Sequence, residues 1–308
     1  MKPVNLISPT LVFSSFAYVQ RITATWIRLL DTATVSQPRQ VQLSTGYRFG
    51  FLNLRIDDLC LTLREGRPCD IAWVDTALLL DRVHQSVKAR PARIFTCSQW
   101  DKEKAERLGV RVEGVVPRPF SPVAFMYRHR KLEKRYDVCL IGWHIQPDRK
   151  NFKYADELVR RLGLKAVAIT NYQGAWERID FSSIGDFEKF RLIANSKFLL
   201  HLSGAEGFGM PVVEAMAAGV PAIFLDRPAH NEFAVGYRIP VEQVAQLKLP
   251  LGTCESALPK MDEAVEVVEQ ALGEYGTERY EELSAKCIER ADTMLQQFLS
   301  WLEGVVGR

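Results

Sequence analysis

The sequence predicts an α/β protein with two doubly wound, Rossmann-like domains. Its 308 residues exceed what one compact core comfortably holds. Short apolar runs alternate with segments of helical periodicity, which is the pattern of parallel strands covered by helices. The alternation stops at about residues 118–135, where two prolines precede a cluster of basic residues. We therefore expect a first domain at residues 1–130, a second domain at 136–283, and a final helix at 284–308.

In the first half, apolar runs predict strands, and helical spacing predicts the helices between them. Phe16, Ile22 and Trp26 recur at helical spacing. Ser98 is placed to cap a helix that Gly109 ends. The expected strands are 4–8, 69–75, 92–98 and 110–117, and the expected helices are 16–30, a segment from 76 onward, and 98–110.

The second half repeats the alternation more clearly. Pro211 stands in the first turn of one expected helix and Gly219 at its end, which are the positions these residues favour. Two amphipathic helices close the chain. The expected strands are 138–142, 165–170, 197–203 and 220–226, and the expected helices are 152–164, 186–196, 211–219, 262–276 and 278–306.

Composition excludes several classes of protein. Hydrophobic residues make up 47% and charged residues 25%, which is ordinary for a folded globular chain and argues against disorder. The six cysteines are scattered without a C-x-x-C pair, so we expect reduced thiols rather than a disulfide scaffold. No uncharged apolar stretch reaches 18 residues, so no transmembrane helix is expected. The start of the chain is read as a strand and a helix rather than a signal peptide.

Several common chemistries are excluded by spacing. There is no G-K-[ST] for a P-loop and no G-x-S-x-G for a nucleophile elbow. Val212 stands where a dinucleotide fingerprint needs its third glycine. The five histidines show no metal-ligand spacing with one another or with cysteine, and an Asp-x-Asp pair is missing from the sequence. No metal site is expected.

The stretch "HLSGAEGFGMPVVEAMAAGVPAIFLD", residues 201–226, predicts a strand, a turn and a helix. The turn would expose backbone N–H groups at a helix N-terminus, where an open α/β sheet binds anions such as a diphosphate. Glu214, placed in the first turn of that helix, is a natural acceptor for the two vicinal hydroxyls of a ribose. The alternative is a capped helix in which Glu206 and Glu214 are incidental.

Two glutamates with seven residues between them, around G-F-G-M-P, resemble the signature of retaining glycosyltransferases of the GT-B fold, most closely glycosyltransferase family 4. The segments "VCLIGWHIQPDRKNF", "RPAHNEF" and "IFTCSQWDKEKAERLGV" resemble the same family. The resemblance implies two Rossmann-like domains facing across a cleft, the first of them shortened, with the helix at 284–308 crossing back to the first domain. It also implies transfer of a hexose from a UDP- or GDP-sugar to an acceptor, with retention at the anomeric carbon and without metal or other cofactor.

The resemblance also implies roles for individual residues. Glu214 would bind the ribose, and Glu206 would be the catalytic residue that faces the donor sugar at the reacting carbon. Arg149 and Lys150 correspond to cations that bind the diphosphate. The remaining residues implied to contact the sugar and diphosphate are Gly207, Phe208, Gly209, Met210 and Val212.

The chain departs from the family pattern in the loop after the strand at 138–142. Trp143 and His144 stand where the family has an arginine. Either Arg149 serves both diphosphate positions, or the donor is held more weakly. The second case leaves an alternative function, a non-catalytic nucleotide-sugar-binding module. Glu232 is read either as a donor-pocket residue or as a surface residue.

The first half fits the family less well. Ser14 and Ser15 replace a Gly-Gly loop, and the domain is shorter than usual. Asp75 ends a strand and is read as the cap of the next helix or, second, as a residue of the crevice. His84 is read as a helix-surface residue.

Charge is distributed unevenly behind the net charge of +3. Residues 1–135 carry 22 Lys and Arg against 12 Asp and Glu, whereas the rest carry 18 against 25. A basic first domain suggests an anionic or lipid-linked acceptor, with peripheral contact to the inner face of a membrane and a cytoplasmic location. A basic face that is simply solvated is the alternative. Nucleic acid is disfavoured because no aromatic residues interleave a basic run.

Overall fold

The computed structural model describes two compact units, which are treated separately. Unit 1 comprises residues 1–119 and 294–308, and unit 2 comprises 120–293. The described residues are 22, 25, 26, 42–44, 57–62, 71–74, 93–128, 132–144, 146–249 and 252–306. The expectations for residues 4–8, Ser14, Ser15, Asp75, His84 and the helix from 76 lie outside them. The predicted domain limits remain a prediction.

Unit 1 contains a five-stranded sheet in the order β1-β2-β3-β4-β5. The strands are β1 (Gln42–Ser44), β2 (Asp57–Thr62), β3 (Ile71–Val74), β4 (Arg93–Thr96) and β5 (Gly114–Val115). The parallel pairing predicted for this half holds for β3 with β4 and for β4 with β5. Strands β1 and β2 were not predicted; β1 pairs with β2, and β2 with β3, in antiparallel fashion. The connection 63–70 is shorter than the dozen or more residues that a parallel crossover needs.

The helical expectations in unit 1 are confirmed where the structure describes them. Ile22 and Trp26, one turn apart, are helical and buried. Helix α3 (Gln99–Arg107) begins after Ser98, whose Oγ accepts a hydrogen bond from the Asp101 backbone N–H at 3.1 Å. Gly109 follows its end at φ +75°.

Unit 2 contains six parallel strands in the order β11-β10-β9-β6-β7-β8. They are β6 (Tyr136–Ile141), β7 (Ala166–Ile169), β8 (Glu177–Ile179), β9 (Ser196–His201), β10 (Ala222–Leu225) and β11 (Gly236–Ile239). The chain starts at β6, moves outward to β7 and β8, and then returns to place β9 on the other side of β6. This reversal makes the gap between β6 and β9 the topological switch point, where open α/β sheets bind ligands.

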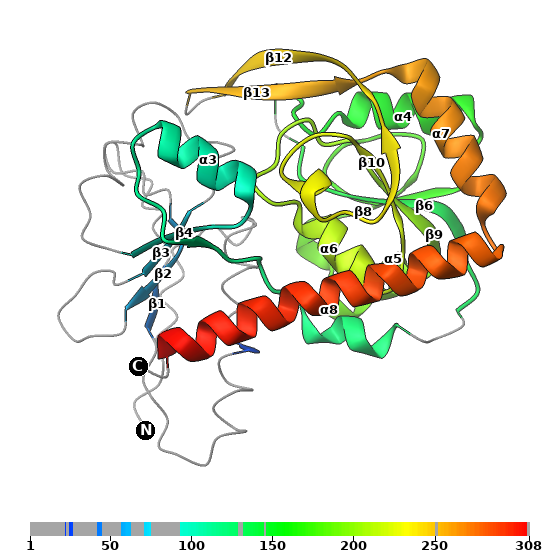
Figure 1. Ribbon diagram of the computed structural model, residues 1–308. Coiled ribbons are helices and arrows are strands. Elements are labelled where there is room, and N and C mark those ends of the chain that lie inside the picture. Colours follow the sequence, from blue (N-terminus) through cyan, green and yellow to red (C-terminus); the bar gives the residue numbers. More distant parts are fainter. Residues whose placement is uncertain are drawn as a thin grey trace. The chain divides into compact units, whose positions relative to one another are not determined.

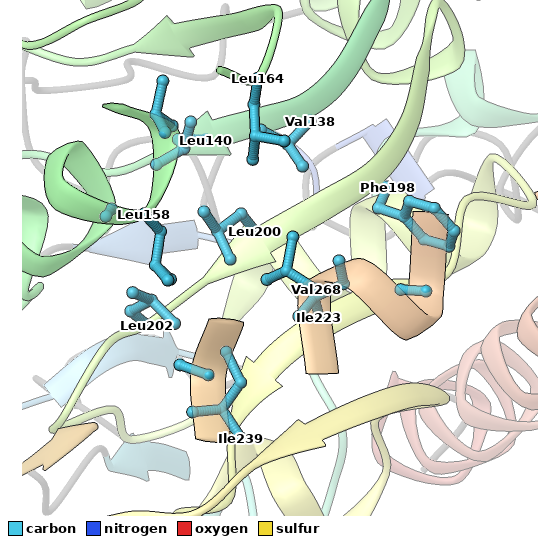
Figure 2. Packing of buried hydrophobic residues seen from close by; sticks show 14 of the residues in the cluster. Val138, Leu140, Leu158, Leu164, Phe198, Leu200, Leu202, Ile223, Ile239 and Val268 are labelled. Atoms are coloured by element: carbon cyan, nitrogen blue, oxygen red, sulfur yellow. The ribbon is translucent and has the colours of Figure 1, made fainter. Parts of the chain in front are cut away.

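Helices cover both faces of the unit 2 sheet, and β7 and β10 are accordingly apolar and buried along their whole length. Helices α4 (Phe152–Arg161) and α7 (Met261–Glu274) cover one face, and α5 (Asp186–Ala194) and α6 (Met210–Ala217) cover the other (Figure 1). On the first face, alternate strand residues pack with Leu158 of α4 and Val268 of α7 (Figure 2). The strand residues labelled there are Val138, Leu140, Phe198, Leu200, Ile223 and Ile239.

The segment predicted as a linker, 118–135, belongs to unit 2 from Phe120 onward. It forms a short 3-10 helix, η1 (Pro122–Met126). Ser121 Oγ donates to Asp186 Oδ2 at 2.9 Å, and Tyr127 Oη donates to the backbone oxygen of Phe187 at 3.0 Å. Arg128 forms two hydrogen bonds with the Asp292 carboxylate, at 2.9 and 2.6 Å.

Other elements of unit 2 were not predicted. Strands β8 and β11 are short, and a further antiparallel hairpin joins β12 (Val241–Leu249) to β13 (Gly252–Pro259).

The final helix, α8 (Glu278–Val306), matches the expected helix at 278–306, and the division between units falls within it. In unit 1 the Trp301 ring contacts Phe95 edge-on at 5.4 Å. Within the described parts of the chain, no helix has the length and apolar character to cross a membrane.

Candidate active site

Two loops meet at the switch point of the unit 2 sheet. The loop after β6 carries Arg149 and Lys150, and the loop after β9 carries Glu206. The Gly204 backbone N–H donates to the Arg149 backbone oxygen at 2.9 Å, which ties the two loops together. Three residues predicted from the sequence for the site are therefore adjacent, although 56 positions separate Lys150 from Glu206.

Two cations converge on the buried carboxylate of Glu206. Lys150 Nζ forms a hydrogen-bonded ion pair with Glu206 Oε1. Arg149 Nη1 lies 3.8 Å from Glu206 Oε2 and donates to the Ala205 backbone oxygen at 2.7 Å. Glu206 is only 8% exposed, so little solvent screens these charges.

The cations determine the protonation state of Glu206. Burial alone would raise the pKa of this carboxyl, because it disfavours the charged form. The charges of Lys150 and Arg149 and the contact with His201 outweigh burial and hold the pKa well below its usual range. Glu206 is therefore a carboxylate at neutral pH. Without a ligand it therefore has no proton to give.

Two histidines lie behind Glu206. His201 Nε2 is 3.5 Å from Glu206 Oε1, and the rings of His201 and His230 meet edge to face at 4.9 Å. His230 Nε2 donates to the Leu225 backbone oxygen at 2.9 Å. Burial lowers the pKa of both rings, that of His230 to about 3. Both histidines are thus neutral at pH 7, and the positive charge beside Glu206 comes from Lys150 and Arg149.

The turn before α6 requires glycine. Gly209 has φ +100°, in the left-handed region, and a Cβ there would lie 2.9 Å from His230 Cβ. The Phe208 ring packs against Phe233 at 4.7 Å. Because Phe208, Met210 and Val212 are all buried, any ligand at this turn would be met by backbone groups rather than by these side chains.

Glu214 has a separate partner. It is 2% exposed, and Lys189 Nζ of α5 donates to its Oε1 at 2.7 Å. The expected place of Glu214 in the first turn is wrong, because α6 begins at Met210 and its first turn holds no acidic residue. Glu214 is the fifth residue of the helix. Pro211 and Gly219 stand at the start and after the end, as predicted.

Asn151 was missed by sequence reasoning and braces the site. Its Nδ2 donates to the backbone oxygens of Leu202 and Ala257, both at 2.8 Å, and the residue is 1% exposed. Its φ of +57° lies in the left-handed region, which asparagine tolerates better than most residues. The residue type was therefore the signal in the sequence for a special backbone position here. Ala257 belongs to β13 and also donates to the Gly204 backbone oxygen at 2.9 Å, so the unpredicted hairpin supports the loop that carries Glu206.

The loop after β6 has Trp143 and His144 where the resemblance led us to expect an arginine, and it is fixed by other contacts. The Asn171 amide exchanges hydrogen bonds with the backbone N–H and oxygen of His144, at 2.6 and 2.9 Å. Trp143 is 37% exposed and contacts the Phe181 ring at 5.9 Å. Glu232 is exposed in the short 3-10 helix η3 (His230–Glu232).

Comparison with known proteins agrees with this geometry. The family model described as glycosyl transferases group 1 matches residues 126–238, which contain every site residue named above except those of the hairpin. The chain is 28% identical over 236 residues to putative glycosyltransferase 48 of Sulfolobus islandicus filamentous virus, covering 72% of this chain and 71% of that protein. It is 32% identical to putative glycosyltransferase 41 of the same virus, with 61% and 57% covered. The chain thus spans only part of the length of these relatives.

Solved structures confirm the fold class. Anabaena Alr3699/HepE in complex with UDP-glucose superposes with a TM-score of 0.53 at 15% identity, covering 76% of this chain and 72% of that one. WaaG, described as a glycosyltransferase involved in lipopolysaccharide biosynthesis, gives 0.52 at 13% identity, with 77% and 75% covered. The predicted α/β, GT-B fold class is confirmed. Together with the family match, these likenesses support a GT-B glycosyltransferase.

Proposed function

We propose that the chain is a retaining hexosyltransferase of the family 4 type, which moves a hexose from a UDP- or GDP-sugar to an acceptor without a metal. The observation that carries the proposal is the convergence of Arg149, Lys150 and Glu206 at the switch point, beside the N-terminus of α6. Cations and a helix N-terminus together suit a diphosphate. A carboxylate among them suits the sugar that the diphosphate carries.

The donor would be held at two ends. Lys150, Arg149 and the backbone at 207–212 would bind the diphosphate and sugar, and Glu214 would accept hydrogen bonds from the ribose. Without donor, Glu206 neutralises the two cations. The diphosphate brings its own negative charge to them, so the carboxylate is left to address the sugar.

The reaction needs a stabilised leaving group more than a base. The bond between the anomeric carbon and the phosphate oxygen breaks, and the acceptor oxygen bonds to that carbon on the same face. The acceptor proton passes to the leaving phosphate oxygen. Lys150 and Arg149 stabilise the charge on the departing diphosphate, and the Glu206 carboxylate stabilises the positive charge that develops at the anomeric carbon. A carboxylate carries the negative charge that this role needs.

Thermal shift with a panel of nucleoside diphosphates is the first test of this proposal. Because HepE was crystallised with UDP and glucose, UDP is the first nucleotide to try and GDP the second. The right nucleotide should raise the melting temperature by mass action, and the others should not. Donor turnover is then followed by release of free nucleotide on adding acceptor, and the anomeric configuration of the product by NMR.

A non-catalytic nucleotide-sugar-binding module is the second candidate, favoured by Trp143 and His144 in place of the family arginine. Such a module would show the thermal shift but release no nucleotide with any acceptor. A product with inverted configuration would instead keep the transferase and exclude retention. A chain that no nucleoside diphosphate stabilises would contradict both candidates.

We further propose an anionic, lipid-linked acceptor, because residues 1–135 carry an excess of basic residues. Phospholipid vesicles with and without anionic headgroups, sedimented with the protein at low and high salt, test this. Binding should require the anionic lipid and weaken with salt. Sedimentation that is indifferent to both would leave the basic excess as a solvated face.

A further inference from the structure

Glu214 and Lys189 form an ion pair that is almost completely withdrawn from water. The two residues are 2% and 8% exposed, and Lys189 Nζ lies 2.7 Å from Glu214 Oε1. They belong to neighbouring helices, α6 and α5. Burial of two charges is costly and repaid only when the geometry is good, and removal of one partner leaves the other charge uncompensated. Such a pair fixes the position of the carboxylate.

Lys189 is held from its other side as well. Its Nζ lies 3.9 Å from Oδ1 of Asp186, one turn earlier on α5. The other oxygen of Asp186 accepts a hydrogen bond from Ser121 Oγ at 2.9 Å. The ammonium group of Lys189 therefore lies between the carboxylates of Glu214 and Asp186. The Asp186 carboxylate is in turn hydrogen-bonded to Ser121, which lies where the chain enters unit 2.

We propose that Lys189 is a positioning residue that sets the preference of the donor site for ribose over 2′-deoxyribose, by orienting the Glu214 carboxylate. This inference rests on the proposed role of Glu214 in ribose binding. A carboxylate offers about four acceptor positions, of which the Lys189 hydrogen bond takes one. With Oε1 held, the carboxylate keeps one orientation toward the vicinal hydroxyls.

The preference follows from hydrogen bonding. A site whose buried acceptor is aimed at a hydroxyl discriminates against an analogue that lacks it, because the acceptor is then left unpaired. Without Lys189 the carboxylate is free to turn away or to take other partners. Affinity for the ribonucleotide then falls, whereas the deoxyribonucleotide has little to lose.

The test compares dissociation constants of UDP and 2′-deoxy-UDP, and of GDP and 2′-deoxy-GDP, by calorimetry on the full chain. We expect the unchanged protein to prefer the ribonucleotide about ten- to a hundredfold. K189M should bring this ratio close to one, mainly through weaker binding of the ribonucleotide. K189R, which keeps a cation at the same place, should retain more of the preference than K189M.

Lys197 supplies a matched control. Its Nζ lies 2.7 Å from Asp137 Oδ1, an ion pair of the same length at the start of β9 and β6, the opposite end of these strands from the site. K197M also removes a paired lysine and should leave the ratio unchanged. A preference lost equally in K189M and K197M would mark a general loss of structure and overturn the proposal.

The remaining outcomes separate this inference from the proposed function. If E214A loses the preference and K189M keeps it, Glu214 binds ribose but Lys189 does not position it. If E214A also keeps it, or if neither diphosphate binds, the ribose role fails together with the inference. Should K189M not fold, K189M/E214A is compared with E214A, since alanine leaves no side-chain acceptor at 214 for Lys189 to position. Equal ratios are expected when Lys189 acts only through Glu214, and a further fall in the double variant would contradict the proposal.

Discussion

The surroundings of Glu206 and Glu214 differ, although both glutamates are buried carboxylates paired with a lysine. Glu206 lies in a loop and faces two cations, Lys150 and Arg149, from another loop at the switch point. Glu214 lies within α6, and its partner Lys189 comes from the neighbouring helix α5. His201 lies beside Glu206, and His230 packs against His201.

The two glutamates should respond differently to a ligand. A ligand would reorganise the ion pairs of Glu206, whereas the ion pair of Glu214 would stay as it is. The cations beside Glu206 lie on the loop that follows the C-terminal end of β6, where a diphosphate would compete with the carboxylate for them. The Lys189 pair links two helices that pack on the sheet, so it belongs to the scaffold that presents Glu214. We therefore expect changes at Glu206 to act on turnover and changes at Glu214 to act on nucleotide affinity.

Replacement of Glu206 should have the largest effect. Glu206→Ala should lower single-turnover transfer about a hundred- to a thousandfold, the order lost when one preorganised electrostatic partner is removed from a transition state. Affinity for the bare nucleoside diphosphate should not fall, because Lys150 and Arg149 remain to bind it and the competing carboxylate is gone. Calorimetry and rapid-quench transfer measure the two quantities. An equal loss of nucleotide affinity in Glu206→Ala and Glu214→Ala would remove the distinction between the two sites.

Glu214→Ala should have the next largest effect, on binding. Loss of the carboxylate leaves the ribose hydroxyls unpaired and should weaken nucleotide binding by about 1.5 to 3 kcal/mol, or about ten- to a hundredfold. Turnover at saturating donor should change less than in Glu206→Ala. Should both variants change only the midpoint of unfolding, with binding and transfer per folded molecule intact, the two glutamates would have structural roles alone.

Sequence reasoning succeeded where the signal is local. The strand, turn and helix at 196–217 were predicted from an apolar run, from the glycines of the turn and from Pro211 in the first turn of the helix. The left-handed φ of Gly209 agrees with that turn. The nearness of Arg149 and Lys150 to Glu206 follows from family resemblance and from the rule that loops meet at a switch point.

The partner of Glu214 was not predictable in this way. Lys189 stands 25 positions earlier in "DFEKFRLIA", where a lysine is typical of a solvated helix face. Only the packing of α5 against α6 buries it. The support from the hairpin of β12 and β13 was not predictable either, for a different reason. Ala257 supports the site through its backbone groups, which leave no mark on the side-chain pattern.

The histidines beside Glu206 should give this region its own pH dependence. The folded protein holds His230 neutral with a pKa of about 3, whereas the unfolded chain takes up the proton near pH 6.5. The stabilisation is therefore complete above about pH 6.5 and is lost as the pH falls toward 3, by at most about 1.4 kcal/mol per pH unit. His201, whose pKa is also lowered by burial, adds in the same direction.

Denaturant titrations between about pH 7 and 5 measure this slope. Glu206 does not obscure it, because a lowered carboxyl pKa contributes stability that is lost only below the unfolded value of about 4.3. His230→Gln removes one titrating ring and should flatten the dependence of unfolding free energy on pH. A slope that is the same in His230→Gln would show that His230 is not held neutral.

The smallest expected effect concerns Arg149, the second cation beside Glu206. Its Nη1 donates to the Ala205 backbone oxygen at 2.7 Å but lies 3.8 Å from Glu206 Oε2, so its main direct bond is to the loop. Arg149→Lys keeps the charge and shortens the reach, and should cost about 0.5 to 1.5 kcal/mol of donor affinity, a few-fold to about tenfold. Arg149→Met removes the charge as well and should cost more, because the diphosphate loses one of two cations. Calorimetry with UDP or GDP compares the two variants. Equal losses would show that Arg149 serves the site by bracing the loop and that Lys150 alone meets the diphosphate.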